Sequence, residues 1–128
     1  MNYCNHSASP VGRFVIDLHL KNKLSKSKLT KIYSSTDSLC NCLQILNHLQ
    51  DLKEDYINLN RVYLPKIFFE KEKITVECLK GNKSPLGLKK IINMCLDNID
   101  KYLLNAEKNL YLISDKRLLK ETFVIYFI

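Results

Sequence analysis

The residues best suited to chemistry are two aspartates, Asp51 and Asp55, which lie four positions apart. On a helix, Gln44 and Asn47 would share one narrow polar stripe with them. Like charges at this spacing destabilise a helix by about 0.2–0.5 kcal/mol, and a divalent cation between them would reverse the sign. Mg²⁺ takes oxygen ligands and commonly binds one or two carboxylates together with the phosphates of a substrate. The pattern therefore predicts Mg²⁺ bridging Asp51 and Asp55 to a diphosphate, with the two amides as hydrogen-bond donors.

The alternative is that this stripe is the solvated edge of an ordinary helix. Two aspartates at this spacing occur by chance on many surface helices. Lysine is dense elsewhere but absent from residues 32–52, whereas a water-facing edge in so lysine-rich a chain would be expected to carry some. This absence favours a stripe that faces a cavity. The surrounding positions are mostly apolar: Leu39, Leu43, Ile45, Leu46, Leu49 and Leu52.

Two further residues each have a functional and an ordinary interpretation. Arg61 follows Asp55 by six positions, and its guanidinium could bind a phosphate there in bidentate fashion. Equally, Arg61 could form a surface ion pair with Asp55 or Glu54, which is worth little in water. Tyr3 is either a buried aromatic residue or one whose hydroxyl faces a cavity. Spacing alone decides neither case.

Composition bounds the fold and the partners. The chain has 128 residues, 46% of them hydrophobic, with three glycines and three prolines, which favours one mostly helical domain over residues 1–128. The net charge of +7 would suit a polyanion, but it comes almost entirely from lysine and no recognition motif accompanies it, so no nucleic acid is expected. No signal peptide and no apolar run of about 20 residues is present, so a cytoplasmic location is expected.

Apolar residues recurring every three or four positions predict several helices. The expected helices cover residues 1–20 in two pieces around Pro10, 37–56, 85–111 and 114–127. Gly12 should permit close approach of another backbone or a ligand. Before the central helix we expect an exposed basic connector at 21–31 and helix caps at 34–37. After it we expect a turn at Asn58 and Asn60, then a core segment with Ile67, Phe68 and Phe69. Residues 74–79 could form either a strand or a short helix.

Two stretches carry a family resemblance. Residues 3–13, YCNHSASPVGR, resemble the Y-C-x-x-S-A-x-P-V-G-R segment of squalene and phytoene synthases. Residues 43–55, followed by R-V-Y-L-P at 61–65, resemble that family's second aspartate-rich motif and its R-x-Y-L-P continuation. Gln50 and the S-A-S-P-V-G-R run look closest to the bacterial branch that makes hydroxysqualene for hopanoids. One departure is Asn60, where the family usually has glycine.

The resemblance implies an all-α isoprenoid-synthase helical bundle around a central cavity. Its chemistry joins two prenyl diphosphates, such as farnesyl diphosphate, head to head, with Mg²⁺ as cofactor. By position the resemblance assigns six roles: Tyr3 would face the reacting centre, Gln44, Asn47 and Arg61 would bind diphosphate, and Asp51 and Asp55 would hold Mg²⁺.

In this family a first aspartate-rich motif should precede Tyr3. The resemblance therefore implies a C-terminal fragment, a partial bundle without its N-terminal helices that is inactive alone. A separately encoded N-terminal half is an expected partner, and peripheral contact with the inner face of the membrane is also expected. Two other hypotheses remain: a non-catalytic helical module that binds through its basic surface, and a non-functional product of a degraded gene.

Overall fold

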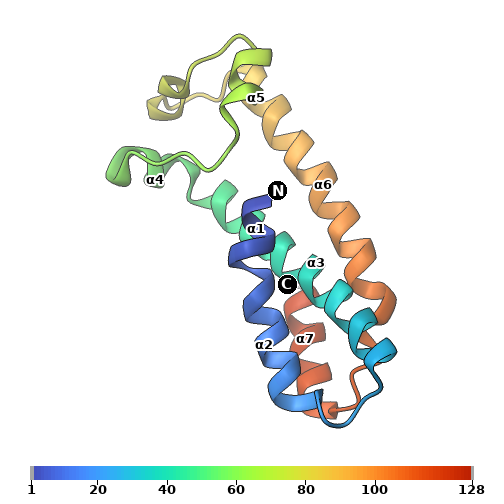
Figure 1. Ribbon diagram of the computed structural model, residues 1–128. Helices are drawn as coiled ribbons and strands as arrows, with labels where there is room; N and C mark the ends of the chain where they lie inside the picture. Colours follow the sequence, from blue (N-terminus) through green and yellow to red (C-terminus); the bar gives the residue numbers. More distant parts are fainter. Residues whose placement is uncertain (1, 128) are drawn as a thin grey trace. The chain divides into compact units, whose positions relative to one another are not determined.

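The computed structural model describes residues 2–127, and these contain helices and connecting segments but no strand (Figure 1). The predicted all-α class is confirmed. The elements are α1 (Asn2–Ser7), α2 (Ser9–Leu20), α3 (Lys26–Gln50), α4 (Leu52–Leu59), α5 (Lys66–Lys71), the 3₁₀ helix η1 (Val76–Lys80), α6 (Leu86–Leu110) and α7 (Lys116–Phe127). Among the described residues, no helix has the length and apolar character needed to cross a bilayer.

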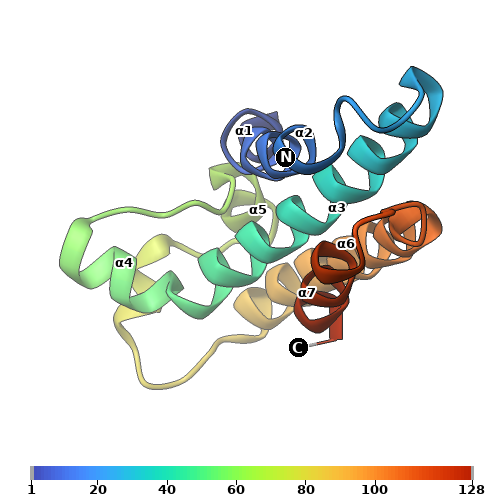
Figure 2. The same ribbon diagram turned by 90° about the horizontal axis from the view of Figure 1, so that it is seen from below.

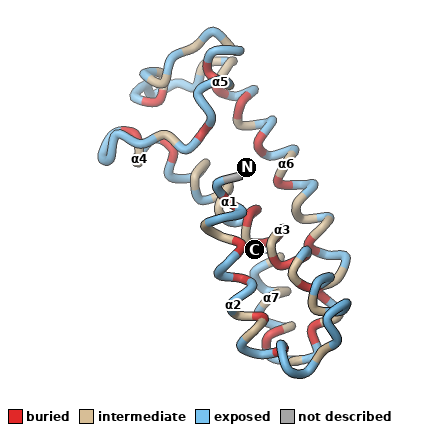
Figure 3. Tube along the Cα trace, in the orientation of Figure 1, coloured by how far each residue is buried: buried red, intermediate tan, exposed pale blue. Residues whose placement is uncertain are grey.

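The chain forms two compact units, and each has its own hydrophobic core. The first unit runs to Gln44 and resumes at Asp100, and the second is Ile45–Ile99. Helices α3 and α6 contribute residues to both, and buried positions recur along each of them (Figure 3). The first core contains Ile16, Leu20, Ile32, Leu110, Ile113 and Leu118. The second contains Leu52, Tyr56, Leu64, Phe69, Leu79, Leu88, Ile91 and Cys95.

The N-terminal segment forms two helices, as predicted, with the break at Ala8. Pro10 lies in the first turn of α2, where its missing N–H removes no helical hydrogen bond. Gly12 is buried, and a Cβ there would lie 2.6 Å from both Cys40 Sγ and Thr36 Cγ2. Helix α2 therefore packs against α3 at this point (Figure 2), which confirms the predicted close approach.

The predicted central helix, residues 37–56, was wrong at its start. Helix α3 begins at Lys26, so the expected caps at 34–37 lie inside it and part of the expected connector is helical. The hydroxyl of Ser35 donates to the Asn105 carbonyl (3.2 Å), and Asn105 Nδ2 donates to Ser38 Oγ (2.6 Å). The Ser35 hydroxyl thus bonds to α6 instead of acting as a cap, while the Ser38 hydroxyl accepts from Asn105 and also donates to the Ser34 carbonyl within α3 (3.0 Å).

The second unit corrects two smaller predictions. Phe69 is buried, as expected, but Ile67 is 53% exposed because the six-residue helix α5 turns it outward. The ambiguous segment at 74–79 is helical, with η1 beginning at Val76. Contacts to α4 hold η1 in place: the Tyr56 hydroxyl donates to Glu77, and Lys53 Nζ donates to the Gly81 carbonyl (3.0 Å).

Helix α7 begins with an acidic cap that makes a pH-dependence prediction. The Asp115 carboxylate accepts hydrogen bonds from the amides of Leu118 and Arg117, both at 3.0 Å, and it lies 3.4 Å from His19 Nδ1. The amide of Leu118, then that of Arg117 and the neighbouring His19, lower the pKa of Asp115 below its ordinary value of 3.8.

A carboxyl group whose pKa is depressed on folding stabilises the folded state above its unfolded pKa, and this contribution is lost as pH falls through the folded pKa. We expect Asp115→Asn, which keeps a cap acceptor but does not titrate, to show a shallower loss of unfolding free energy between about pH 5 and pH 2. Urea unfolding followed by circular dichroism at several pH values measures this. Asp97→Asn on exposed α6 is the control, and identical slopes for wild type and Asp115→Asn would contradict the prediction.

Candidate functional site

The two predicted metal ligands lie at a bend between α3 and α4. Helix α3 ends at Gln50, Asp51 has φ −89° and ψ 2°, and α4 begins at Leu52. The predicted continuous helix over 37–56 is therefore interrupted. Its hydrogen-bond ladder nevertheless continues, since the Asp51 amide donates to the Asn47 carbonyl (2.9 Å) and the Asp55 amide to the Asp51 carbonyl (2.8 Å). The two carboxylates thus keep their one-turn spacing across the bend.

Both carboxylates act on the same imidazole. Burial lowers the pKa of His48 from its ordinary value, while the negative charges of Asp55 and Asp51 act in the opposite direction. The negative charges of both aspartates thus favour the protonated form of this imidazole. The His48 ring also stacks on Tyr63, with centroids 3.9 Å apart and planes 13° apart. The sequence interpretation missed His48, although its positions relative to Asp51 and Asp55 (i, i+3, i+7) place all three on one helix face.

Arg61 is tied to Asp55 through the backbone. Helix α4 ends at Asn60, whose φ of 50° and ψ of 41° are left-handed, and the amides of Asn60 and Arg61 both donate to the Asp55 carbonyl, the latter at 3.1 Å. Asparagine is one of the few residues besides glycine that enter this region readily. The predicted turn is confirmed at Asn60, whereas Asn58 lies inside α4. Within the described part of the chain, the exposed guanidinium of Arg61 forms no ion pair with Asp55 or Glu54.

Asn47, Asp51, Asp55 and Arg61 all belong to the second unit, with Asn47 and Asp51 exposed and Asp55 half-buried. The other two predicted site residues belong to the first unit. Gln44 Oε1 accepts a hydrogen bond from Ser7 Oγ (2.9 Å), and the same hydroxyl bonds the Tyr3 carbonyl (3.0 Å). Tyr3 is 59% exposed, so of its two interpretations the buried aromatic residue is excluded.

The polar side chains beside Gln44 form a buried chain of hydrogen bonds. Asn41 is 3% exposed, its Nδ2 donates to Asn5 Oδ1 (2.7 Å), and its Oδ1 accepts from Ser9 Oγ (3.1 Å). These bonds join α1 and α2 to α3 at the level of Gln44. The sequence interpretation assigned no role to Asn41, because its partners lie more than 30 positions away.

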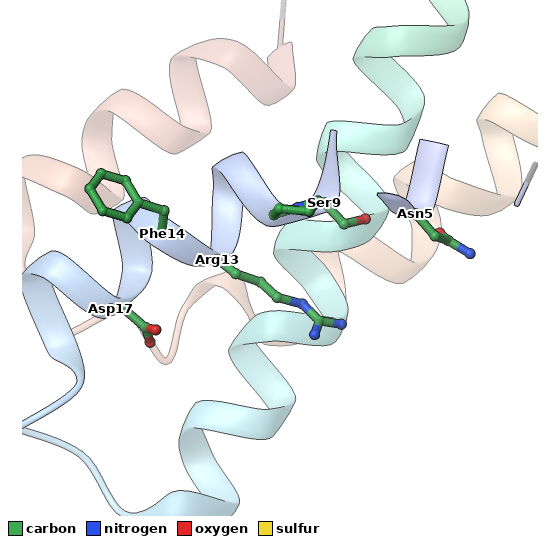
Figure 4. Close-up of a pocket in the computed structure, with 6 residues that line it drawn as sticks. Asn5, Ser9, Arg13, Phe14 and Asp17 are labelled. Carbon is green, nitrogen blue, oxygen red and sulfur yellow. The ribbon is translucent and has the colours of Figure 1, made fainter. Parts of the chain in front are cut away.

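A second cluster of charge, on α2 and α3, is internally neutralised. Arg13 donates through Nε to Asp37 Oδ1 (2.8 Å), and its guanidinium lies 5.6 Å from the centre of the Tyr33 ring. The Tyr33 hydroxyl donates to Asp17, and this bond raises the pKa of Tyr33 to about 12. Arg13 and Asp17 line one open pocket of about 390 Å³ (Figure 4). Because these charges are already paired, we interpret the cluster as a structural link between α2 and α3.

The donor set at Asp51 and Asp55 fits a hard cation. It offers two carboxylates and a neighbouring amide, all oxygen ligands, as Mg²⁺ requires when a substrate phosphate completes its shell. Among the residues that the structure describes, no group of three or more His, Cys, Asp or Glu side chains could hold a metal. The residues fit Mg²⁺ shared with a diphosphate better than a fully protein-ligated metal such as structural zinc.

The fold is that of the all-α isoprenoid synthases. It matches the crystal structure of squalene synthase HpnC from Alicyclobacillus acidocaldarius with a TM-score of 0.80 and 25% identity, covering 98% of this chain and 45% of that one. The family model for squalene/phytoene synthase matches residues 1–126. The chain belongs to the squalene/phytoene synthase family.

Curated relatives resemble the chain over part of their own length. Hydroxysqualene synthase from Zymomonas mobilis is 36% identical over 125 residues, which is 98% of this chain and 40% of the relative. Hydroxysqualene synthase from Sinorhizobium fredii is 42% identical over 88 residues, or 69% of this chain and 28% of the relative. The chain therefore spans about 40% of the length of the first of these relatives.

Proposed function

We propose that this chain supplies one carboxylate-bearing part of the diphosphate site of a transferase that joins two prenyl diphosphates head to head. Three relatives are named hydroxysqualene synthase, so the product we propose is hydroxysqualene, and the family resemblance makes farnesyl diphosphate the proposed substrate. One observation carries the proposal. Asp51 and Asp55 lie one helical turn apart, and the backbone of Arg61 is bonded to that of Asp55.

In this proposal Asp51 and Asp55 hold Mg²⁺, which when bound neutralises charge on the departing diphosphate. The exposed guanidinium of Arg61 binds diphosphate oxygens in bidentate fashion. Asn47, exposed one turn before Asp51, orients the same group through its amide. These residues bind and orient the leaving group.

The roles of Gln44 and Tyr3 rest on the family resemblance. Gln44 Oε1 and the Tyr3 carbonyl share the single proton of Ser7 Oγ, and Gln44 is proposed to bind diphosphate through its amide nitrogen. The exposed ring of Tyr3 is proposed to face the reacting carbon. We assign one carboxylate pair of this chain to Mg²⁺, and the family chemistry uses two. We therefore propose that the chain is inactive alone and acts with a second segment, encoded separately, that carries the other acidic motif.

Removal of the metal tests the proposal. Isothermal titration of the 128-residue chain with farnesyl diphosphate should show binding in millimolar Mg²⁺. Affinity should fall at least about tenfold, or 1.4 kcal/mol, when EDTA replaces the metal. Farnesol, which lacks the diphosphate, is the control ligand and should not respond to Mg²⁺. Binding that is equal with and without Mg²⁺ but falls steeply with salt would instead support the non-catalytic basic module.

A further inference from the structure

The segment that carries Arg61 has two faces. Burial alternates along it: Val62 is half-buried and Leu64 is 8% exposed, while Arg61 and Tyr63 are exposed. Val62 and Leu64 belong to the second core or pack against it. In an extended segment alternate side chains point to opposite sides. Arg61 and Tyr63 therefore share the side that faces away from the core.

On this outer side, the ring of Tyr63 contacts a ring on α3. The His48 imidazole stacks on the Tyr63 ring at 3.9 Å, and the planes are nearly parallel at 13°. His48 lies one turn before Asp51, and both Asp51 and Asp55 act on it electrostatically. The side chain that stacks on Tyr63 thus belongs to the same stretch of chain as the two aspartates.

The geometry points to His48 and Tyr63 as positioning residues. Their stacked rings, which we call the clasp, fix the Arg61 guanidinium beside Asp51 and Asp55. This inference rests on the proposed function, because its ligand is a Mg²⁺-bound diphosphate. The backbone bond from Arg61 to the Asp55 carbonyl restrains one end of the segment, and the stack restrains the other. Neither ring needs to touch the ligand, and a ring of similar shape at position 48 should serve as well as histidine.

The clasp itself can be tested without ligand. An aromatic pair adds about 0.5–1.5 kcal/mol beyond the area that it buries. We therefore expect His48→Ala and Tyr63→Ala to increase amide hydrogen exchange at residues 62 and 63 by about two- to tenfold, while His48→Phe restores the wild-type rate. Ile67→Ala, which removes an exposed apolar side chain from the same unit, is the matched control. Unchanged exchange in both alanine variants would overturn the clasp.

Its effect on the ligand is measured by titrating each variant with inorganic pyrophosphate in Mg²⁺. His48→Ala should weaken binding about two- to tenfold, His48→Phe should bind as wild type does, and Mg²⁺ alone should bind all variants equally. In an Arg61→Ala background the further change His48→Ala should have no effect, since the clasp acts through Arg61. A wild-type chain that does not bind Mg²⁺-pyrophosphate would overturn the proposed function. Wild-type binding with His48→Ala unchanged, or a full His48→Ala effect without Arg61, would overturn this inference alone.

Discussion

Replacing both aspartates, Asp51→Asn with Asp55→Asn, should weaken Mg²⁺-dependent binding of farnesyl diphosphate on the order of 100-fold or more. Each substitution keeps the side-chain shape and removes one charged oxygen ligand. Contacts to charged groups contribute about 1.5–3 kcal/mol each, so the loss of two gives at least this factor. Titration calorimetry in millimolar Mg²⁺ provides the measurement.

The same double variant should fold as well as the wild type or slightly better. Like charges one turn apart destabilise a helix by about 0.2–0.5 kcal/mol, and the change removes them. Urea unfolding checks this and separates lost binding from lost folding. Glu54→Gln is the matched control, because Glu54 is exposed on α4 beside Asp55 and has no assigned role. A double variant that still binds the ligand like the wild type would refute the assignment of Asp51 and Asp55.

Gly12→Ala should destabilise the chain by about 1–3 kcal/mol, the usual cost of overpacking. An alanine in a helix interior ordinarily stabilises by about 0.5–1 kcal/mol relative to glycine, so the expected sign is reversed. The reason is steric, because the new Cβ would lie 2.6 Å from both Thr36 Cγ2 and Cys40 Sγ. Urea unfolding monitored by circular dichroism gives the free energy.

A second substitution can identify the steric cause. Thr36→Ser deletes the Cγ2 atom that the new Cβ would meet, so part of the lost stability should return in the Gly12→Ala, Thr36→Ser double variant. The single variant Thr36→Ser supplies the remaining corner of the double-mutant cycle. A Gly12→Ala chain more stable than the wild type would show that α2 and α3 do not approach as closely as described.

Local patterns predicted the helices whose ends and faces are encoded nearby. The interval 85–111 contains an apolar stripe that follows Pro85, and α6 spans Leu86–Leu110. The start of α3 was missed for the opposite reason. Serines at 35 and 38 are typical of helix caps in a local reading, but here they bond with Asn105 on a distant helix. A partner some 70 positions away leaves no local signal.

The same distinction between local and long-range information applies to the candidate site. Spacing alone brought Asp51 and Asp55 together, and the structure keeps that spacing although the helix bends at Asp51. The reach of Arg61 could be stated only as a possibility, because it depends on the left-handed conformation of Asn60. The stack of His48 on Tyr63 follows from the same reversal. Sequence reasoning thus found the charged groups, while the backbone turn that gathers them required coordinates.

If Asp55 and Arg61 bind one ligand, as we propose, the length of α4 matters for binding as well as for packing. The helix has eight residues, Leu52–Leu59, and the chain leaves it at Asn60 in a direction set by that count. One residue more or fewer would rotate the exit by about 100° and displace it by about 1.5 Å along the axis. Arg61 would then emerge on a different face from Asp55, and Tyr63 would be carried away from His48. Insertions and deletions should be tolerated in the exposed segment at 81–84. Helix α4 should tolerate substitutions, but not a change in its number of residues.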